Sequence, residues 1–433
     1  MYKIYLIVFI LCITASLAQN EQKTYFDTGE LKSVTTSSED GLYLETKQYF
    51  KNGNLEYTGF IEGEYSLAGI NYKKNGFWKL YHKNGKLYAE GKYVDDEKQD
   101  EWKIYDEVGT LRENTNYYDD EKDGLSKEFY PNGKIERTGS YINGEMNGEW
   151  KIYDENGQLR NISELLNGIK SGEQKTYFEN GKLFNTGSFQ QDAETGEWKV
   201  YHPNGQLQQI GTYANGQLTG EWKYFTEEGK LLRIGIFNNE EGKVTTKEYY
   251  PNGNLRSEST TVLDKLNGLW SYYYENGNLF SIREFIEGKL MNVLKLLDIN
   301  GNVLDFGTLK DGNGTLKTYD NSGNVTGENL YKEGLLDGES KSYFENGQLV
   351  ATGLYINGKR NKEWKIYHKN GSLYQIILYK SGKLMDIISC FDGTGNALDK
   401  GTLQNGNGTI KKYTTEGELI EEAIVKDGVV VSS

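Results

Sequence analysis

The sequence predicts an all-β protein, an elongated single-sheet solenoid of tandem antiparallel β-hairpins with about 17 units of 24 residues. Three observations support this fold class. A turn glycine recurs at 17 positions between Gly29 and Gly417, mostly at steps of 24. Tyrosine (34) and glycine (52) are abundant, while only three prolines occur, which suits short strands joined by tight turns. Near-copies of the phrase NGEWKIYDENGQL, which ends at Leu159, recur at the same spacing. Such periodicity indicates a repeat architecture.

The first 18 residues predict a secretory signal peptide. Lys3 supplies a positive charge, residues 4–13 form an apolar core too short to span a bilayer comfortably, and Ala18 follows Ser16 at a suitable cleavage position. We therefore expect an exported protein, located in the periplasm, the cell envelope or outside the cell. Cleavage would remove Cys12 and leave a single cysteine, which excludes an intramolecular disulfide bond in the mature chain.

The remaining residues, 19–433, are expected to form one continuous repeat array. One step of the period, from Gly53 to Gly85, contains eight extra residues near positions 65–74. A longer period is visible near the C-terminus, where GKLMNVLKLLDINGNVL at Gly288 is echoed by GKLMDIISCFDGTGNAL at Gly382, 94 residues later. The segments 241–334 and 335–428 therefore resemble a duplicated block of four units.

Each unit should contain two strands and two turns. In the unit from Glu149 to Gly168, residues 149–153 and 158–166 carry the aromatic and β-branched residues typical of strands. All three prolines stand two places before a turn glycine, where a fixed φ suits a type I turn and the glycine can adopt a left-handed conformation. The turn positions that represent the repeat are Gly133, Gly157, Gly181 and Gly205.

A second glycine recurs inside the second strand of many units, as at Gly139. Glycine weakens a strand unless something needs the room, so we expect an aromatic ring, such as that of Trp150 or Tyr141, to lie over the bare backbone. Trp150 and Ile152 should share the buried face, because alternate residues of a strand point the same way. The tryptophans assigned to the structural positions of the repeat are Trp102, Trp150, Trp198, Trp222, Trp270 and Trp364.

These units resemble the MORN repeat, and more closely its bacterial variant. The resemblance covers nearly the whole mature chain and depends on the pattern G-x-W-x-x-Y-x-x-N-G-x-L, seen here as Gly148, Trp150, Tyr153, Asn156, Gly157 and Leu159. It implies hairpins laid side by side into a curved or twisted sheet with a groove. Members of the variant family are frequently labelled as antitoxin components of toxin–antitoxin systems.

The sequence contains no recognisable catalytic constellation. The histidines His82, His202 and His368 all stand at the same place before the turn, and His82 and His202 are five units apart, too far to share a site. No nucleophile–base arrangement, P-loop or dinucleotide motif is present. We therefore expect no catalytic residue and no enzyme activity, and we keep an enzyme only as a third hypothesis.

Three loops offer oxygen atoms at alternate positions and are candidates for weak Ca²⁺ binding. They begin at Asp298, Asp320 and Asp392. None has the bidentate glutamate and twelve-residue spacing of a calcium loop, and aspartate and asparagine are ordinary turn residues. We expect no cofactor and no dedicated metal site.

Composition and geometry together predict a non-enzymatic scaffold that binds a protein or a glycan along its extended sheet surface, where exposed Tyr and Trp are good contact residues. The formal net charge of −14 argues against nucleic acid and anionic membrane as partners, because an acidic surface repels phosphate groups. The alternative is an antitoxin or immunity protein that neutralises a toxin by binding, for which acidic charge would suit a basic toxin.

Overall fold

The computed structural model describes residues 20–432, which form strands, turns and loops without any helix. This part of the chain accordingly offers no helical segment long and apolar enough to cross a membrane. The expected signal peptide, with Cys12, lies outside the described residues. The chain divides into two compact units, the first ending at Gln206 but including Tyr213–Gln217, and the second made of Leu207–Thr212 and Leu218–Ser433.

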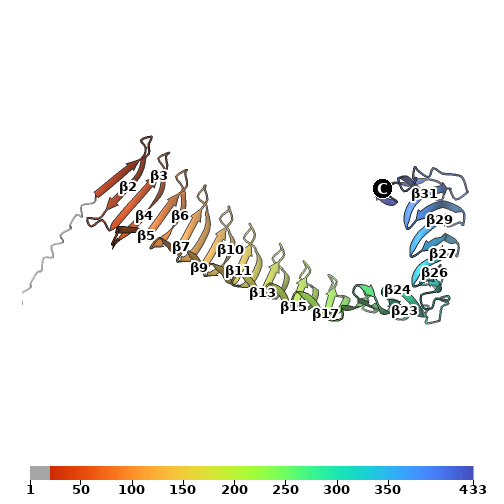
Figure 1. Cartoon of the computed structure of the whole chain (residues 1–433). Coiled ribbons are helices and arrows are strands. Elements are labelled where there is room, and N and C mark those ends of the chain that lie inside the picture. Colours follow the sequence, from red (N-terminus) through yellow and green to blue (C-terminus); the bar gives the residue numbers. More distant parts are fainter. Residues whose placement is uncertain (1–19, 433) are drawn as a thin grey trace, which may run out of the picture. The chain divides into compact units, whose positions relative to one another are not determined.

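The first unit is a run of antiparallel hairpins in which each strand pairs with the strands before and after it in the chain (Figure 1). Its strands are β1 (Asn20–Tyr25), β2 (Leu31–Ser37), β3 (Tyr43–Tyr49), β4 (Leu55–Ser66), β5 (Gly69–Tyr81), β6 (Leu87–Val94), β7 (Glu97–Tyr105), β8 (Leu111–Tyr118), β9 (Glu121–Phe129), β10 (Ile135–Ile142), β11 (Glu145–Tyr153), β12 (Leu159–Leu166), β13 (Ile169–Tyr177), β14 (Leu183–Gln190) and β15 (Ala193–Tyr201). β16 (Leu207–Ala214) and β17 (Gln217–Phe225) contain the division between the units.

The second unit also consists of antiparallel hairpins, but its hydrogen-bonded ladder is interrupted twice. β25 to β31 form a sheet of seven strands and β32 to β34 a sheet of three. The strands are β18 (Leu231–Asn238), β19 (Lys243–Tyr249), β20 (Leu255–Val262), β21 (Lys265–Leu266), β22 (Gly268–Tyr273), β23 (Leu279–Ile286), β24 (Lys289–Leu296), β25 (Gly314–Tyr319), β26 (Val325–Lys332), β27 (Leu335–Tyr343), β28 (Leu349–Ile356), β29 (Lys359–Tyr367), β30 (Leu373–Lys380), β31 (Lys383–Cys390), β32 (Gly408–Tyr413), β33 (Leu419–Lys426) and β34 (Val429–Ser432). The prediction of an all-β chain of tandem antiparallel hairpins is confirmed.

The turn of each hairpin contains the glycine that the sequence predicted at this position. In the hairpin of β11 and β12, the Gly157 N–H donates to the Asp154 carbonyl oxygen (2.8 Å), and the Asp154 N–H donates to the Gln158 carbonyl oxygen (2.9 Å). This is a type I turn followed by a glycine bulge, which requires a left-handed residue. The φ angle of Gly157 is +82°, and all 17 turn glycines have positive φ.

The turns between hairpins are of a different kind. Asn143 and Gly144 have φ angles of +47° and +79°, and two successive positive values define a type I′ turn, which suits the twist of antiparallel strands. The acidic run at Asp95 is such a turn. The Asp96 carboxylate accepts the Lys74 N–H (2.8 Å), so this turn is tied to β5 of the preceding hairpin.

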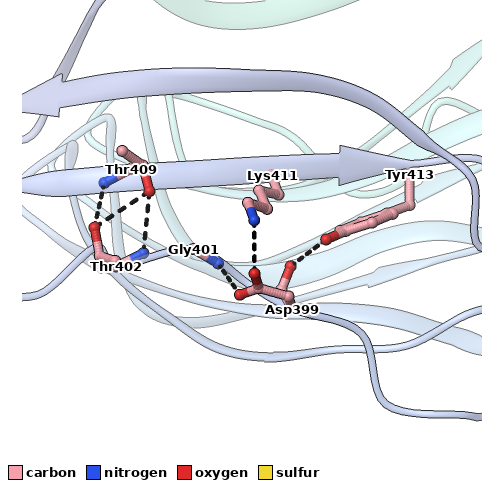
Figure 2. A network of polar contacts seen from close by, with 6 residues as sticks. All are labelled: Asp399, Gly401, Thr402, Thr409, Lys411 and Tyr413. Carbon is pink, nitrogen blue, oxygen red and sulfur yellow. Dashed lines mark hydrogen bonds and ion pairs between the residues drawn. The ribbon is translucent and has the colours of Figure 1, made fainter.

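Two loops, residues 297–313 and 391–407, interrupt the hairpins of the second unit. Figure 2 shows the polar contacts that fix the second loop against β32. The Lys411 ammonium lies 2.6 Å from the Asp399 carboxylate, and the Tyr413 hydroxyl donates to the Asp399 carbonyl oxygen (2.7 Å). The Thr409 N–H donates to the Thr402 hydroxyl (3.0 Å), and the Thr402 N–H donates to the Thr409 hydroxyl (3.3 Å).

The first loop is fixed in the same way, 94 residues earlier in the chain. The Lys317 ammonium pairs with the Asp305 carboxylate, and the Tyr319 hydroxyl donates to the Asp305 carbonyl oxygen (2.6 Å). Each loop covers an apolar core. The first core consists of Phe285, Leu290, Val293, Leu296, Leu309 and Leu316. The second consists of Ile387, Leu403, Ile410, Ala423 and Val425.

Candidate functional site

A tryptophan lying across glycine in the preceding strand is the most regular side-chain feature of the repeat. A Cβ atom on Gly139 would overlap the Trp150 indole ring. The Trp150 indole N–H donates to the Ser140 carbonyl oxygen (3.1 Å), and the side chain is only 3% exposed. Six pairs share this arrangement: Trp78 with Gly59, Trp102 with Gly91, Trp150 with Gly139, Trp198 with Gly187, Trp222 with Gly211 and Trp364 with Gly353.

A bulge explains why the ring comes from Trp150 and not from Tyr141. Gly148, two residues before the tryptophan, has a φ angle of +72°, and the register of β10 with β11 shifts between Thr138 and Ser140. Three residues of β11, 148–150, thus lie opposite Gly139 alone, and a bulge with a left-handed glycine re-aims nearby side chains. Tyr141 instead packs edge-on against the indole, with ring centroids 5.1 Å apart.

In the hairpin of β11 and β12, fewer side chains are buried than the sequence predicted. Ile152, expected to share the buried face with Trp150, is 44% exposed. Its partners in the neighbouring strands are Arg137 and Asn161, which are polar and offer no apolar surface to cover it. Burial in this hairpin therefore depends on Trp150 more than on Ile152, whereas Leu80 and Ile104, at the same position of other repeats, pack against an apolar core.

Trp270 departs from this arrangement. The place of the glycine beneath it, 11 residues earlier, is taken by Ser259. The ring of Trp270 is only partly buried and packs against Phe285, with ring centroids 5.7 Å apart and planes inclined at 51°. Of the six tryptophans assigned to structural positions, this is the one that lines an open cavity.

The opposite face of the sheet carries a regular series of charged pairs. In β11, Glu149 precedes the tryptophan and its carboxylate lies 2.7 Å from the Lys151 ammonium, which raises the pKa of Lys151 through a hydrogen bond and charge attraction. Exposed pairs of this kind contribute little to stability, so their main effect is a polar, mixed-charge surface. The same pairing occurs at Glu101–Lys103, Glu173–Lys175, Glu197–Lys199, Glu221–Lys223 and Glu339–Lys341.

Three exposed aromatic residues interrupt this polar surface near the start of the array, beside the Glu45–Lys47 ion pair of β3. Tyr43, Phe60 and Phe77, here called the outer aromatic patch, come from the adjacent strands β3, β4 and β5 and are 58%, 52% and 50% exposed. Phe77 stands where Glu101 and Glu149 stand in later repeats. The three residues thus bring apolar rings to a face that is elsewhere charged.

The outer aromatic patch has a polar rim. Tyr43 and Phe60 line a shallow hollow together with Glu62 and Asn75. The Asn75 side-chain amide donates to the Glu62 carboxylate (2.6 Å), which fixes both side chains at the edge of the hollow. The Glu62 carboxylate also raises the pKa of Tyr43, chiefly by charge repulsion with the phenolate.

The eight extra residues noted in the sequence lengthen the hairpin that carries part of the patch. β4 and β5 contain 12 and 13 residues, whereas most such strands contain eight or nine. The extension carries Tyr65 (73% exposed) and Tyr72 (41% exposed). The Tyr72 hydroxyl donates to the Gly41 carbonyl oxygen (3.0 Å), so the extension is held against the turn before β3.

The histidines link neighbouring turns. The Nε2 atom of His82 lies 2.9 Å from the Tyr105 carbonyl oxygen, and that of His368 lies 3.0 Å from the Phe391 carbonyl oxygen. In another repeat the hydroxyl of Tyr130 bonds in the same way to a carbonyl oxygen 23 residues later. His202 occupies the same turn position. The structure therefore gives His82 and His368 each a carbonyl partner in the next repeat.

The candidate calcium loops use their carboxylates internally. Asp298 accepts hydrogen bonds from the backbone N–H groups of Asn300 (2.9 Å) and Asn302 (2.8 Å) and from the Asn302 side chain (2.9 Å). These bonds, that of the Asn302 side chain above all, lower the pKa of Asp298. Asp320 and Asp392 make equivalent contacts. Within residues 20–432, no three His, Cys, Asp or Glu side chains gather as a metal site.

Sequence reasoning missed a ladder of side chains that joins successive turns. The Asn132 side-chain amide donates to the Glu155 carbonyl oxygen of the next turn (2.7 Å), while its Oδ1 atom accepts the Lys134 N–H (3.0 Å). The Lys134 ammonium donates to the Asn156 carbonyl oxygen (2.8 Å). The recurrence of Asn and Lys around the turn glycine is the signal in the sequence that marks this ladder.

A family profile described as MORN repeat variant matches ten segments of the chain, which together cover half of it. The segments are 74–95, 122–143, 146–167, 170–191, 194–215, 218–239, 244–262, 266–287, 336–357 and 360–381. None of the curated protein sequences is similar to this chain.

Among solved structures, the chain is similar to a chain of the TcdB2-TccC3-TEV crystal structure, with 12% identity and a TM-score of 0.16 over 94% of this chain and 26% of that one. A chain of the Photorhabdus luminescens Tc holotoxin pore gives 12% identity and a TM-score of 0.17 over 95% and 26%. A porin-like protein from Bacteroides uniformis gives 12% identity and a TM-score of 0.11 over 55% and 91%. The chain thus spans about a quarter of the length of the first of these.

Proposed function

Because this chain belongs to the MORN repeat variant family, we propose that it is an exported, non-enzymatic scaffold that binds a protein or a glycan through the outer face of its hairpins. The observation that carries this proposal is the outer aromatic patch of Tyr43, Phe60 and Phe77. These rings are about half exposed.

The chemistry of the patch suits a binding surface. Aromatic side chains supply large contact area at low entropic cost and are enriched where proteins bind partners. Contiguous exposed apolar surface rimmed by polar groups is the usual mark of an interaction site. Here the rim consists of Glu62 and Asn75, which are hydrogen-bonded to each other, and the extension with Tyr65 and Tyr72 lies on the same hairpin.

Export is supported by the N-terminal sequence. The positive charge at Lys3, the short apolar stretch and the small residues before Gln19 have the organisation of a signal peptide. An exported scaffold would meet envelope proteins and cell-surface saccharides, which are the two classes of partner that the aromatic patch would fit.

The test uses the mature chain as bait in an extract of the cell envelope and on a glycan array. The variant is Phe60→Ser with Phe77→Glu, which introduces residues that later repeats carry at these positions, such as Ser140 and Glu149, and so should fold normally. The control is Ile152→Ser, which removes an exposed apolar side chain (44% exposed) outside the patch.

We expect a ligand that is retained by the wild type and the control but lost by the double variant. A ligand retained equally by all three would rule out the patch as the binding site. A saccharide on the array would identify the glycan class, and a small basic protein whose toxicity the scaffold suppresses would identify a neutralising role.

A further inference from the structure

A second, separate feature is a cavity in the second unit, formed by the hairpin of β22 and β23. Its lining residues are Trp270, Tyr272, Phe280, Ser281 and Arg283, and its volume is about 180 Å³. Trp270 pairs directly with Arg283 across the two strands, and Tyr272 pairs with Ser281. Since alternate residues of a strand point to the same face, these four side chains share one side of the hairpin.

Arg283 is the unusual member of this cavity. Its Nε atom is buried without a hydrogen-bond partner, and among residues 20–432 its guanidinium forms no ion pair with a carboxylate. Burial lowers the pKa of Arg283, because the charged form loses hydration. Buried polar groups are nearly always paired, and an unpaired buried donor needs an explanation. The Nε–H of Arg283 is therefore a buried donor that no described residue of the chain satisfies.

The chain contains its own comparison, because the related hairpin 94 residues later has the cavity positions filled. Ile377 stands at the place of Arg283 and packs against the second apolar core. Gln375 stands at the place of Ser281, and its side-chain amide donates to the Cys390 sulfur (3.4 Å) and to the Lys411 carbonyl oxygen (3.3 Å). The smaller Ser281 leaves this space open.

The tryptophan of the cavity is also differently placed. In the later hairpin Trp364 lies over Gly353 and is 3% exposed. In the first hairpin Ser259 occupies the glycine position, so the Cβ and hydroxyl of serine fill the room that the indole would need. Trp270 therefore remains partly exposed and lines the cavity, whereas Trp364 packs against the backbone of Gly353.

A further cation lies near the cavity. The Arg256 Nε–H donates to the Tyr272 hydroxyl (3.0 Å), and the guanidinium carbon lies 5.9 Å from the Tyr272 ring centroid. This contact raises the pKa of Arg256. Arg256 itself lines a separate hollow with Glu248, so Arg283 is the one cation among the lining residues of this cavity.

We propose that this cavity binds a carboxylate attached to a six-membered ring, either an aromatic acid or a sugar acid. The planar guanidinium of Arg283 matches a carboxylate in two-point geometry, and the faces of Trp270, Tyr272 and Phe280 offer stacking surface for the ring. The volume suits one ring, since a cavity of about 150 Å³ accepts benzene. This goes beyond the scaffold function proposed above and involves a different unit, so either proposal can fail alone.

The experiment is isothermal titration calorimetry of the full mature chain with four probes. Benzoate and glucuronate carry the carboxylate, and benzamide and glucose are their neutral counterparts. We expect at least one acid to bind about tenfold more tightly than its neutral counterpart, as a charge-assisted pair requires. Preference for benzoate would identify an aromatic acid, and preference for glucuronate a sugar acid. Equal binding of acid and neutral probe, or no binding of any probe, would overturn the proposal.

Two variants test the role of the guanidinium. Arg283→Ile introduces the residue of the later hairpin and should reduce affinity for the preferred acid by about tenfold or more, while Arg283→Lys keeps the charge and should lose less. Arg360→Gln is the control, because Arg360 lies 4.5 Å from the Trp364 ring, beside the tryptophan of the later hairpin. Melting curves check folding, and unchanged affinity in folded Arg283→Ile would reject the site.

Discussion

The indole ring of Trp150 lies directly on the backbone of Gly139, and its N–H group donates to the carbonyl oxygen of the next residue, Ser140. The glycine is needed because no side chain fits beneath the ring. The hydrogen bond satisfies the one polar atom of the indole while the rest of the ring is buried. Each such pair joins one hairpin to the next, so local stability should depend on these contacts.

Replacing Gly139 with alanine should therefore destabilise the hairpins around it. The added methyl group would overlap the indole, and overpacking of this kind typically costs about 1–3 kcal/mol. The measurement is native-state hydrogen exchange of the amides in β10 and β11. Gly235→Ala is the matched control, since Gly235 occupies the same repeat position but the nearest contact of an added methyl group would be the Phe237 side chain of its own strand at 3.0 Å, farther than the Trp150 ring lies at Gly139. Equal losses at both sites would contradict the explanation.

Removing the ring should cost more than crowding it. Trp150→Ala leaves a cavity at a side chain that is 3% exposed, and such truncations cost about 3–5 kcal/mol. Ile152→Ala, two residues away on the same strand and 44% exposed, should cost far less. Chemical denaturation of the two variants beside the wild type measures both effects. A transition of Trp150→Ala that coincides with the wild type would refute the assignment of Trp150 as a stabilising residue.

The ladder of turns predicts different effects for two asparagines at equivalent places. Asn132→Asp removes the donor to the Glu155 carbonyl oxygen and places a carboxylate against it, at a cost of about 1–3 kcal/mol. In the next turn, the carboxylate of Asp154 accepts the N–H groups of Asn156 and Gln158. Asn156→Asp should therefore be nearly neutral. Hydrogen exchange at the two turns distinguishes the variants, and equal effects would show that the ladder contributes nothing.

The turn aspartates predict loss of stability in acid. Hydrogen bonds from the backbone, that of Gln158 foremost, and the nearby Arg160 guanidinium lower the pKa of Asp154 in the folded chain. Because the pKa of Asp154 is lower in the folded than in the unfolded chain, the ionised carboxylate stabilises the fold. This stabilisation is complete above the unfolded-state pKa of about 3.9 and is lost as the pH falls through the folded-state pKa. The melting temperature should fall between about pH 4 and pH 2, less steeply in Asp154→Ala. A flat wild-type profile over this range would disagree.

Export predicts a specific N-terminus. Expression of the full sequence in a bacterium should yield a protein that begins at Gln19, because Ala18 ends the small-residue stretch that follows the apolar core. N-terminal sequencing of the periplasmic and secreted fractions measures this. Ala18→Arg should block cleavage, whereas Thr28→Ala, beyond the cleavage position, should not. Protein that starts at Met1 and remains in the cytoplasm would refute the signal peptide.

The hairpins could be predicted from the sequence because each turn is determined by residues within a few positions of its glycine. The spacing from Gly133 to Gly157 and the residues around each glycine specify the turn chemistry, and the observed φ angles agree. The glycine inside the second strand also predicted an overlying ring. The choice between Trp150 and Tyr141 needed the strand register, which depends on the bulge at Gly148.

The cavity at Arg283 could not be predicted from the repeat pattern. Arg283 stands at a position where many repeats have glycine, so the sequence shows a departure but not its consequence. Its isolation depends on which side chains surround it after folding, and no carboxylate of the described residues pairs with it. The outer aromatic patch could not be predicted either, because Tyr43, Phe60 and Phe77 are separated in sequence and are brought to adjacent strands only by the pairing of β3, β4 and β5.

The lengthened hairpin of β4 and β5 shows how this architecture can acquire new surface. Its eight additional residues divide equally, four on each strand, so the pairing closer to Gly53 and Gly85 is undisturbed. Growth at such a tip adds side chains without altering the neighbouring hairpins, since strand alternation is preserved. Peptide epitopes grafted there in even-numbered lengths should be displayed without loss of fold, which would make the chain a modular host for engineered recognition.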